Sequence, residues 1–229
     1  MSFCTNRRQW NQRMGYRTIV MLGLLGLLLL TGGCGREDTK ESSMERCVVR
    51  IQAGSLQGSG IVYQKDREQF VIVTAAHVLE QEQNRVQVTF YDDFMVESSS
   101  CYVSENSDVA FVLVPTDEMS AGQRKKFTAA SVEKEVFDQL TGGSTVLFQS
   151  AVEEMEATQQ GSVLENWIYV EDFQQYMMLL QGEIHPGMSG GGVFDQNENF
   201  LGILCGANEE GEIAAIPLSI IQAEYAGAY

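Results

Sequence analysis

The feature of this chain that most constrains its fold is a series of short β-rich segments, which recurs from residue 47 almost to the C-terminus. Several segments alternate apolar and polar residues, as half-buried antiparallel strands do, and Gly, Asn and Asp separate them. Because a closed sheet leaves no edge strand exposed, we expect an all-β chain that forms two small antiparallel β-barrels. The predicted strands are residues 47–53, 60–63, 70–74, 85–91, 95–103 and 109–114 in the first half, and 144–149, 159–164, 167–170, 177–181, 192–194, 200–205 and 213–216 in the second.

The composition suits two β-barrels, and a segment of mixed charge separates them. The chain has 22 glycines and only 3 prolines among 229 residues, a turn-rich balance that suits many short strands. We expect an N-terminal barrel over residues 46–115 and a C-terminal barrel, with a weakly helical tail, over residues 144–229. Residues 116–143 are of mixed charge and are predicted to form the inter-barrel linker, with or without a helical turn.

The first 33 residues have the pattern of a secretory signal. Four arginines and no acid precede an uninterrupted apolar run at residues 19–30, which is followed by small residues. The run is short for a membrane span, which needs roughly 20 residues. Cys34 follows two glycines and resembles the lipid-bearing cysteine of bacterial lipoproteins, although Thr31 stands where that pattern has leucine.

We therefore expect an extracytoplasmic, cell-membrane lipoprotein with its lipid on Cys34. An uncleaved signal anchor, or a secreted form, is the alternative. Residues 34–45 are polar and lack periodicity, and they are predicted to form a flexible tether or spacer.

The acidic balance excludes nucleic acid as a partner. The chain has 31 acidic and 15 basic side chains, and its net charge of −16 would become −20 on removal of the arginine-rich leader. A phosphate backbone needs a basic face, which this chain does not offer in bulk. The same charge opposes anionic lipid, so the tether would set the location of the domain.

Cysteine and histidine are too few for a disulfide scaffold or a metal site. Five cysteines occur in the chain, of which Cys47, Cys101 and Cys205 remain beyond the leader and Cys34. One disulfide, such as Cys47–Cys101, is compatible with the sequence and would leave Cys205 as a buried thiol. The two histidines have no closely spaced Cys or His neighbour, so we predict no metal and no cofactor.

Three short segments carry the chemistry. His77 lies in TAAHV at residues 74–78, Asp108 lies in SDVAF at residues 107–111, and Ser189 lies in the glycine-rich HPGMSGGG. Amide hydrolysis needs a nucleophile, a base that takes its proton and donors for the developing oxyanion. An imidazole activates a serine hydroxyl, and an aspartate holds the imidazole in the correct tautomer. Each segment alone is a weak signal, but the three together predict nucleophilic catalysis.

These segments resemble those of trypsin-like serine proteases of the chymotrypsin fold, nearest the HtrA/Deg branch. The resemblance covers about residues 45–222. It is carried by residues 58–62 (GSGIV), 74–78, 107–111 and 186–191, with support from Gly202-Ile203 and Ala215-Ile216-Pro217.

The resemblance implies two perpendicular six-stranded barrels with the active site in the cleft between them. It implies that His77 is the general base, Asp108 its orienting acid and Ser189 the nucleophile. The backbone N–H groups of Gly187 and Ser189 would form the oxyanion hole, and no cofactor would be required.

Two departures from the family pattern bear on regulation. The few residues after Pro217 cannot form the PDZ domain that HtrA proteins typically carry, so we expect none. Met188 stands where digestive trypsins have the aspartate that pairs with a new amino terminus. Activation by that ion pair is therefore excluded, and regulation would come from loop ordering or location.

A small set of residues are candidates for binding the substrate. Glu183 lies six residues before Ser189, where the trypsin pattern has the acid at the base of the substrate pocket, or else it faces solvent on a strand. A buried carboxylate there would favour Lys or Arg side chains. Cys205, Gly206 and Ala207 resemble the strand that pairs with the substrate backbone. His185 is interpreted as a loop or pocket-rim residue.

The sequence thus predicts a membrane-tethered extracytoplasmic serine endopeptidase that acts on polypeptides through an acyl-enzyme. The alternative is a catalytically idle module of the protease fold that binds extended peptides or partner proteins. The complete His, Asp and Ser set favours the enzyme.

Overall fold

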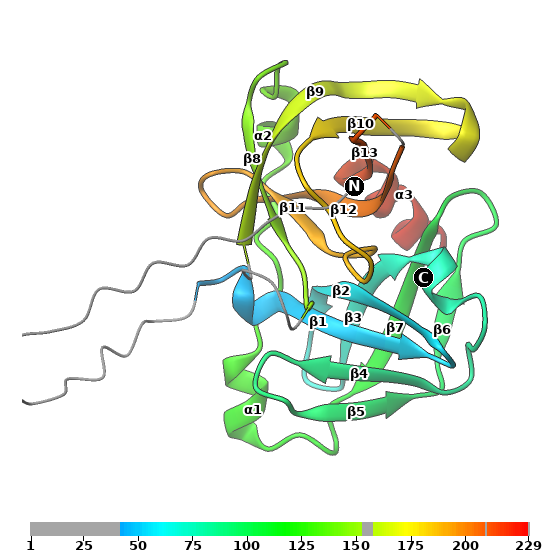
Figure 1. Ribbon diagram of the computed structural model, residues 1–229. Helices are drawn as coiled ribbons and strands as arrows, with labels where there is room; N and C mark the ends of the chain where they lie inside the picture. Colours follow the sequence, from blue (N-terminus) through cyan, green and yellow to red (C-terminus); the bar gives the residue numbers. More distant parts are fainter. Residues whose placement is uncertain (1–41, 153–157, 209, 229) are drawn as a thin grey trace, which may run out of the picture. The chain divides into compact units, whose positions relative to one another are not determined.

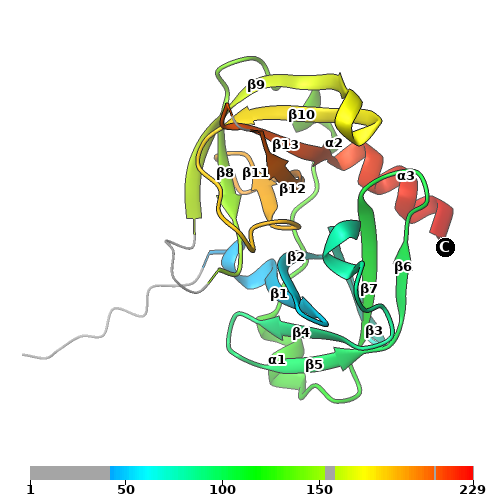
Figure 2. The ribbon, with the colours of Figure 1, turned by 45° about the vertical axis from the view of Figure 1, so that its right-hand side comes forward.

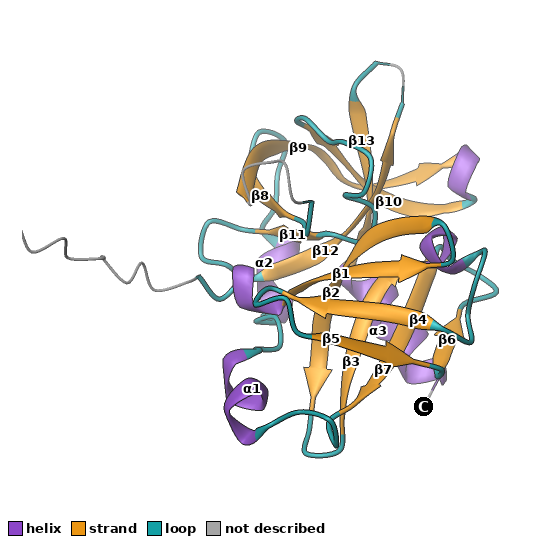
Figure 3. Cartoon of the chain, turned by 60° about the horizontal axis from the view of Figure 1, so that its bottom comes forward, coloured by secondary structure: helices purple, strands orange, loops and turns teal. Residues whose placement is uncertain are grey.

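The computed structural model describes residues 42–152, 158–208 and 210–228. The predicted leader, Cys34 and most of the predicted spacer lie outside the described residues. Strands dominate the described part of the chain, and the α-helices in it are short (Figure 3). These strands form two separate sheets (Figure 1). As the sequence predicts, the strands of the first half of the chain form one sheet and those of the second half form the other.

The first sheet has seven antiparallel strands in the order β5-β4-β1-β2-β3-β7-β6. A short 3-10 helix at Glu45–Cys47 precedes it. Its strands are β1 (Val48–Ala53), β2 (Leu56–Lys65), β3 (Gln69–Ala75), β4 (Val86–Phe90), β5 (Met95–Ser98), β6 (Cys101–Val103) and β7 (Val109–Pro115).

The two edges of this sheet meet, which curls it into a half-barrel. Residues 95–103, predicted as one strand, are two strands on opposite edges, with only two residues between them. The Ser98 hydroxyl donates to the Leu113 carbonyl at 2.6 Å, and the Leu113 N–H donates to the Ser100 carbonyl at 2.9 Å. These contacts, rather than a continuous strand ladder, join the two edges of the first sheet, which stays a half-barrel.

The second sheet is a closed six-stranded barrel in the order β10-β13-β12-β11-β8-β9. The segments 159–164 and 167–170, predicted as two strands, form the single long strand β9, and register shifts against β10 absorb the irregularity between them. The strands are β8 (Thr145–Gln149), β9 (Thr158–Val170), β10 (Gln175–Gln181), β11 (Gly192–Phe194), β12 (Phe200–Ala207) and β13 (Glu212–Pro217).

Short helices occupy the linker and the C-terminal tail. The linker contains α1 (Ala121–Lys126) and α2 (Lys134–Asp138). A capping box begins α1, because Gln123 N–H donates to the Ser120 hydroxyl while Ser120 N–H donates to the Gln123 side chain. Helix α3 (Leu218–Ala228) follows β13 and lies beside β7 (Figure 2).

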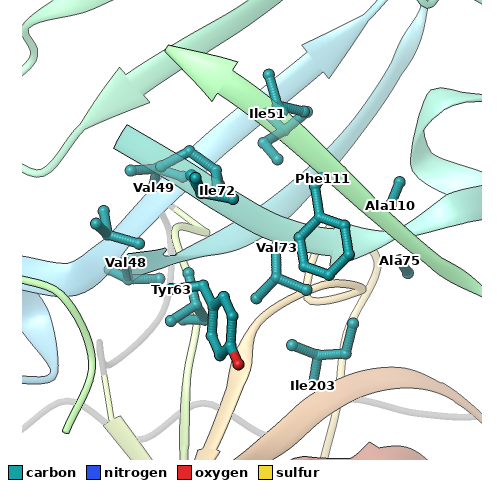
Figure 4. Close-up of a cluster of buried hydrophobic side chains, with 14 of the residues drawn as sticks. Val48, Val49, Ile51, Tyr63, Ile72, Val73, Ala75, Ala110, Phe111 and Ile203 are labelled. Atoms are coloured by element: carbon teal, nitrogen blue, oxygen red, sulfur yellow. The ribbon is translucent and has the colours of Figure 1, made fainter. Parts of the chain in front are cut away.

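The hydrophobic core connects the two strand groups. One cluster of buried side chains combines the interior of the first sheet with residues of the second barrel, including Phe200 and Ile203. Ile203 lies among first-sheet side chains that include Val73 and Phe111 (Figure 4). The Tyr225 ring of α3 packs edge-on against Phe111, with 5.4 Å between ring centroids. Burial of apolar side chains thus holds the two groups together.

Candidate active site

Two neighbouring strands of the first sheet deliver His77 and Asp108 to one end of that sheet. His77 lies in a 3-10 helix (Ala76–Leu79) directly after β3, and Asp108 directly precedes β7. Strands β3 and β7 pair antiparallel, with Ala75 opposite Val109. The end of one strand therefore meets the start of the other, and residues 31 apart in sequence become neighbours.

Asp108 holds His77 at two points. The imidazole Nδ1 lies 2.8 Å from Asp108 Oδ2, and the His77 backbone N–H donates to Oδ1 at 2.9 Å. The Ala76 N–H also donates to the Asp108 carbonyl at 3.0 Å. An ionised carboxylate can only accept, so these contacts place the ring proton on Nδ1 and leave Nε2 as the acceptor.

The same contact changes the proton affinity of the imidazole. The hydrogen bond to Asp108 raises the pKa of His77 above 6.5; partial burial opposes this, and the charges of Asp108 and Glu80 add to it. The His77 side chain is 39% exposed, whereas that of Asp108 is 17% exposed. The His77 imidazole is thus accessible to solvent, whereas the Asp108 carboxylate is largely shielded from it.

Cys205 contributes a thiol and a carbonyl to this region. Burial raises the pKa of the Cys205 thiol well above 9.0, and the charge of Asp108 and a hydrogen bond to it raise that pKa further. The Cys205 carbonyl accepts a hydrogen bond from the Ser189 hydroxyl at 3.0 Å. The side chain of Cys205 is buried beside Asp108, so of the predicted substrate contacts it can offer its backbone only.

A glycine-rich turn carries Ser189. Met188 N–H donates to the His185 carbonyl at 3.1 Å, and Gly187, the third residue of this turn, has φ +93°. Pro at the second position and a positive φ at the third are the marks of a type II turn. Gly191 N–H closes the next turn onto the Met188 carbonyl at 2.8 Å.

The backbone N–H groups of Gly187 and Ser189 have no acceptor among the described residues. These two donors lie two residues apart in consecutive turns and are available to an acceptor outside the described residues. The resemblance to trypsin-like proteases implies the same two N–H groups as oxyanion donors.

Ser59 of β2, which sequence reasoning missed, fixes this turn to the first sheet. Its N–H donates to the Ser189 carbonyl at 2.8 Å, and its hydroxyl donates to the Gly187 carbonyl at 2.9 Å. The hydroxyl also accepts from Ala151 N–H at 3.0 Å, while the Thr74 hydroxyl donates to the Ser59 carbonyl at 2.7 Å. A serine between two glycines in an apolar strand was the available signal.

Of the two interpretations of Glu183, the structure agrees with the exposed side chain, although Glu183 follows strand β10 rather than lying on it. The Glu183 side chain is 80% exposed, and its Oε1 lies 3.3 Å from Nε2 of His185. It follows the end of β10, where no other element covers it, and it faces solvent as the alternative interpretation stated. Gly206 and Ala207 lie on β12 at its open end, and a Cβ added to Gly206 would meet nothing within 4 Å.

Met188 is buried in the second core cluster. Its sulfur accepts the His185 N–H at 3.2 Å. Apolar packing therefore holds this turn where trypsins use an ion pair.

The three cysteines of the described residues are free thiols, so the suggested Cys47–Cys101 disulfide is absent there. Cys47 is buried, which raises its pKa to about 12, and its thiol donates to the Met44 carbonyl at 3.2 Å. The Cys101 thiol donates to the Gln83 carbonyl at 2.6 Å instead.

The described residues contain no group of three His, Cys, Asp or Glu side chains that could hold a metal ion. In the same part of the chain, no helix is long and apolar enough to cross a membrane.

A half-barrel that carries a His–Asp pair and a closed barrel that carries a serine in a glycine turn match the chymotrypsin-like fold. Residues 58–203, more than half of the chain, match the family model described as "Trypsin-like peptidase domain". The chain therefore belongs to the trypsin-like peptidase family, and by class it is a serine endopeptidase.

Solved structures of the Rv3671c protease of M. tuberculosis are similar in fold. The active form has 20% sequence identity and a TM-score of 0.64, over 80% of this chain and 81% of that chain. The inactive form of a serine-to-alanine mutant has 19% identity and a TM-score of 0.64, over 81% of this chain and 87% of that one. None of the curated proteins matches the chain in sequence.

Proposed function

We propose that this chain hydrolyses peptide bonds through Ser189, His77 and Asp108, with an acyl-enzyme intermediate. The observation that carries the proposal is the two-point contact between Asp108 and His77, which leaves Nε2 as a proton acceptor. Within the family we place the chain in the HtrA/Deg branch, on the segments 58–62, 74–78 and 186–191.

The first step requires a rotation of the Ser189 side chain. Its hydroxyl donates to the Cys205 carbonyl, and the described residues offer no hydrogen bond between this hydroxyl and His77. Rotation about the Cα–Cβ bond of Ser189 would replace the hydrogen bond to the Cys205 carbonyl by one to the His77 imidazole. Catalytic hydrogen bonds commonly tighten only when substrate binds. Peptide on the β12 edge at Gly206 and Ala207 would bring its carbonyl to this serine.

Proton transfer and charge stabilisation then follow from the remaining contacts. His77 Nε2 takes the Ser189 proton as the oxygen attacks the carbonyl carbon, and the Asp108 carboxylate stabilises the imidazolium. The N–H groups of Gly187 and Ser189 donate to the oxyanion. His77 next protonates the leaving amine, and water hydrolyses the ester through the same base.

We also propose that Cys34 carries the lipid that tethers the domain outside the cytoplasm, which rests on the leader pattern alone. Mass spectrometry of the mature wild-type protein should find an acylated Cys34 as its first residue, and Cys34→Ala should lose both acylation and cleavage. A mature chain that retains residues 1–33 would favour the signal anchor.

A second candidate, the catalytically idle peptide-binding module, has one observation in its favour. The Ser189 hydroxyl is engaged with the Cys205 carbonyl rather than with the imidazole. In such a module this rotamer would persist when peptide binds.

A fluorophosphonate probe distinguishes the two candidates, because it labels only an activated serine. We expect labelling of the full chain, loss of labelling in Ser189→Ala and in His77→Ala, and unchanged labelling in Ser219→Ala, whose side chain is exposed on α3. Circular dichroism would verify that each variant is folded. Folded wild-type protein without Ser189-dependent labelling, in the presence and absence of peptide, would refute the enzyme.

A further inference from the structure

Exposed apolar side chains gather on one hairpin of the second barrel. The described residues contain six large hydrophobic side chains that are exposed, and four of them lie on β9 and β10. These four are Trp167, Ile168, Tyr169 and Tyr176. Scattered exposed hydrophobics are ordinary on a protein surface, but a contiguous group marks an interaction site.

The aromatic members of this group are ordered against one another. Trp167 stacks on Tyr176 with 5.1 Å between ring centroids and 11° between planes, and Tyr169 meets Tyr176 edge-on at 5.4 Å. Phe137 of α2 meets Trp167 edge-on at 6.3 Å. We call Phe137, Trp167, Tyr169 and Tyr176 the aromatic ladder. Its rings are held in place before a partner arrives, so little side-chain entropy is lost on binding.

The charge around the aromatic ladder is negative. The hairpin from residue 158 to residue 181 contains no Lys, Arg or His, and its exposed acids are Glu165, Glu171 and Asp172. All 15 basic residues of the chain lie at or before Lys134, which begins α2, whereas 15 of its 31 acids lie at or after Glu135. Anionic lipid and a second copy of this acidic surface are therefore repelled, and a cationic partner is attracted.

The hairpin is part of the barrel that carries the nucleophile. Strand β10 ends at Gln181 and continues directly into the segment that holds Ser189. Strand β10 also pairs with β13, whose Ala214 lies opposite Gly206 on the proposed substrate edge. The hairpin of β9 and β10 thus belongs to the same barrel as the segment that carries Ser189 (Figure 1).

We propose that the aromatic ladder is an exosite that docks cationic polypeptide segments, in which Lys or Arg side chains alternate with apolar ones. Trp and Tyr faces attract Lys and Arg cations, and the three acids add charge complementarity. The statement that the docked polypeptide is a substrate rests on the proposed function; the docking itself does not need Ser189.

Trp167 provides a direct reporter of docking. The chain has two tryptophans, Trp10 in the leader and Trp167 in the aromatic ladder. Full-length protein that carries Trp10→Phe and Ser189→Ala is titrated with a 15-residue peptide of Lys, Leu and Gly. The matched control peptide has Glu in place of Lys. We expect a saturable change in Trp167 emission with the Lys peptide alone, weakened by added salt.

Variants test whether the aromatic ladder is the docking surface. Tyr176→Ala should weaken binding of the Lys peptide at least tenfold, whereas Met95→Ala, at an exposed apolar side chain of the first sheet, should leave it unchanged. Thermal unfolding of each variant controls for loss of structure. In the Ser189 form, Tyr176→Ala should lower kcat/KM for a Lys-rich protein at least fivefold and leave a four-residue peptide substrate unaffected.

Several results would overturn the exosite. These are absence of binding, equal binding of the Glu peptide, binding that Tyr176→Ala does not change, or a dimer that sedimentation finds only when Tyr176 is present. Saturable binding together with no cleavage in the Ser189 form would instead retain the docking surface and refute the endopeptidase.

Discussion

The backbone N–H of Ser59 donates to the carbonyl oxygen of Ser189 at 2.8 Å, and so ties the nucleophile's turn to a strand of the other sheet. The Ser59 hydroxyl bonds the same turn at Gly187 and also binds Ala151. Ser59 is fully buried, and so is Thr74, which bonds its carbonyl. The geometry of the turn thus depends on contacts between the barrels as well as on its own glycines.

Ser59→Ala should lower both stability and activity. The backbone bond to Ser189 would remain, but the Gly187 carbonyl and the Ala151 N–H would lose their partner. An unsatisfied buried group costs about 1–3 kcal/mol, which denaturant unfolding would measure. Because the Gly187 turn would also loosen, we expect a decrease in kcat. Ser55→Ala, at an exposed serine, is the control. Unchanged stability would show that Ser59 is not needed.

Gly190→Ala should be among the most destabilising substitutions in the chain. A Cβ at Gly190 would lie 2.1 Å from the Ser59 carbonyl oxygen and 2.3 Å from the Thr74 hydroxyl, at φ +81°. Gly211 has the same φ of +81°, but its Cβ would meet nothing within 4 Å. Gly211→Ala therefore isolates the backbone strain, about 1–2 kcal/mol. Gly190→Ala should exceed it by several-fold in chemical denaturation; equal losses would contradict the predicted clash.

The acid limb of the pH–activity profile should lie above pH 6.5. The general base must be neutral to accept a proton, and the hydrogen bond from Asp108 raises the pKa of His77. For stability the sign is reversed: protonated His77 favours the folded state below pH 6.5, and this contribution is lost as pH rises through the folded-state pKa. Profiles of kcat/KM against pH, with NMR titration of the His77 ring, test both statements.

Asp108→Asn should lower kcat/KM by about four orders of magnitude, as loss of the orienting acid does in related triads. The amide removes the negative charge and replaces one of the two acceptor oxygens by a donor, so the pKa of His77 is no longer raised and the residual activity should show its acid limb at lower pH. Asp195→Asn is the control: this buried acid accepts hydrogen bonds from the Asn197 and Asn199 N–H groups and from the Asn199 side chain, rather than from His77. An unshifted limb would mean that Asp108 does not set the imidazole's proton affinity.

Glu183→Ala should leave the residue preference at the cleaved bond within about twofold, because an exposed ion pair contributes roughly 0–1 kcal/mol. The Glu183 side chain is 80% exposed, and its Oε1 lies 3.3 Å from Nε2 of His185. Profiling with a peptide library, wild type against variant, is the measurement. A selective loss of cleavage after Lys and Arg would restore the pocket role that the sequence suggested.

Local patterns predicted the parts of the fold that depend on local sequence. The alternating segments indicate the strands, and the glycines near Ser189 indicate its turn, because burial and backbone freedom are local properties. The split of residues 95–103 was not predictable, since it depends on the edges of the sheet meeting around Ser98 and Ser100. The role of Ser59 was missed for the same reason: its partners lie on the other barrel. Glu183 shows that spacing from a nucleophile does not determine burial.

The packing of Met188 couples the turn before Ser189 to folding of the second barrel. Its side chain is buried in the core of the second barrel, so the turn before Ser189 becomes ordered when that core forms. Apolar burial, rather than an ion pair with a new amino terminus, then positions this turn. A substitution that loosens this core should therefore disturb the turn before Ser189 together with the barrel.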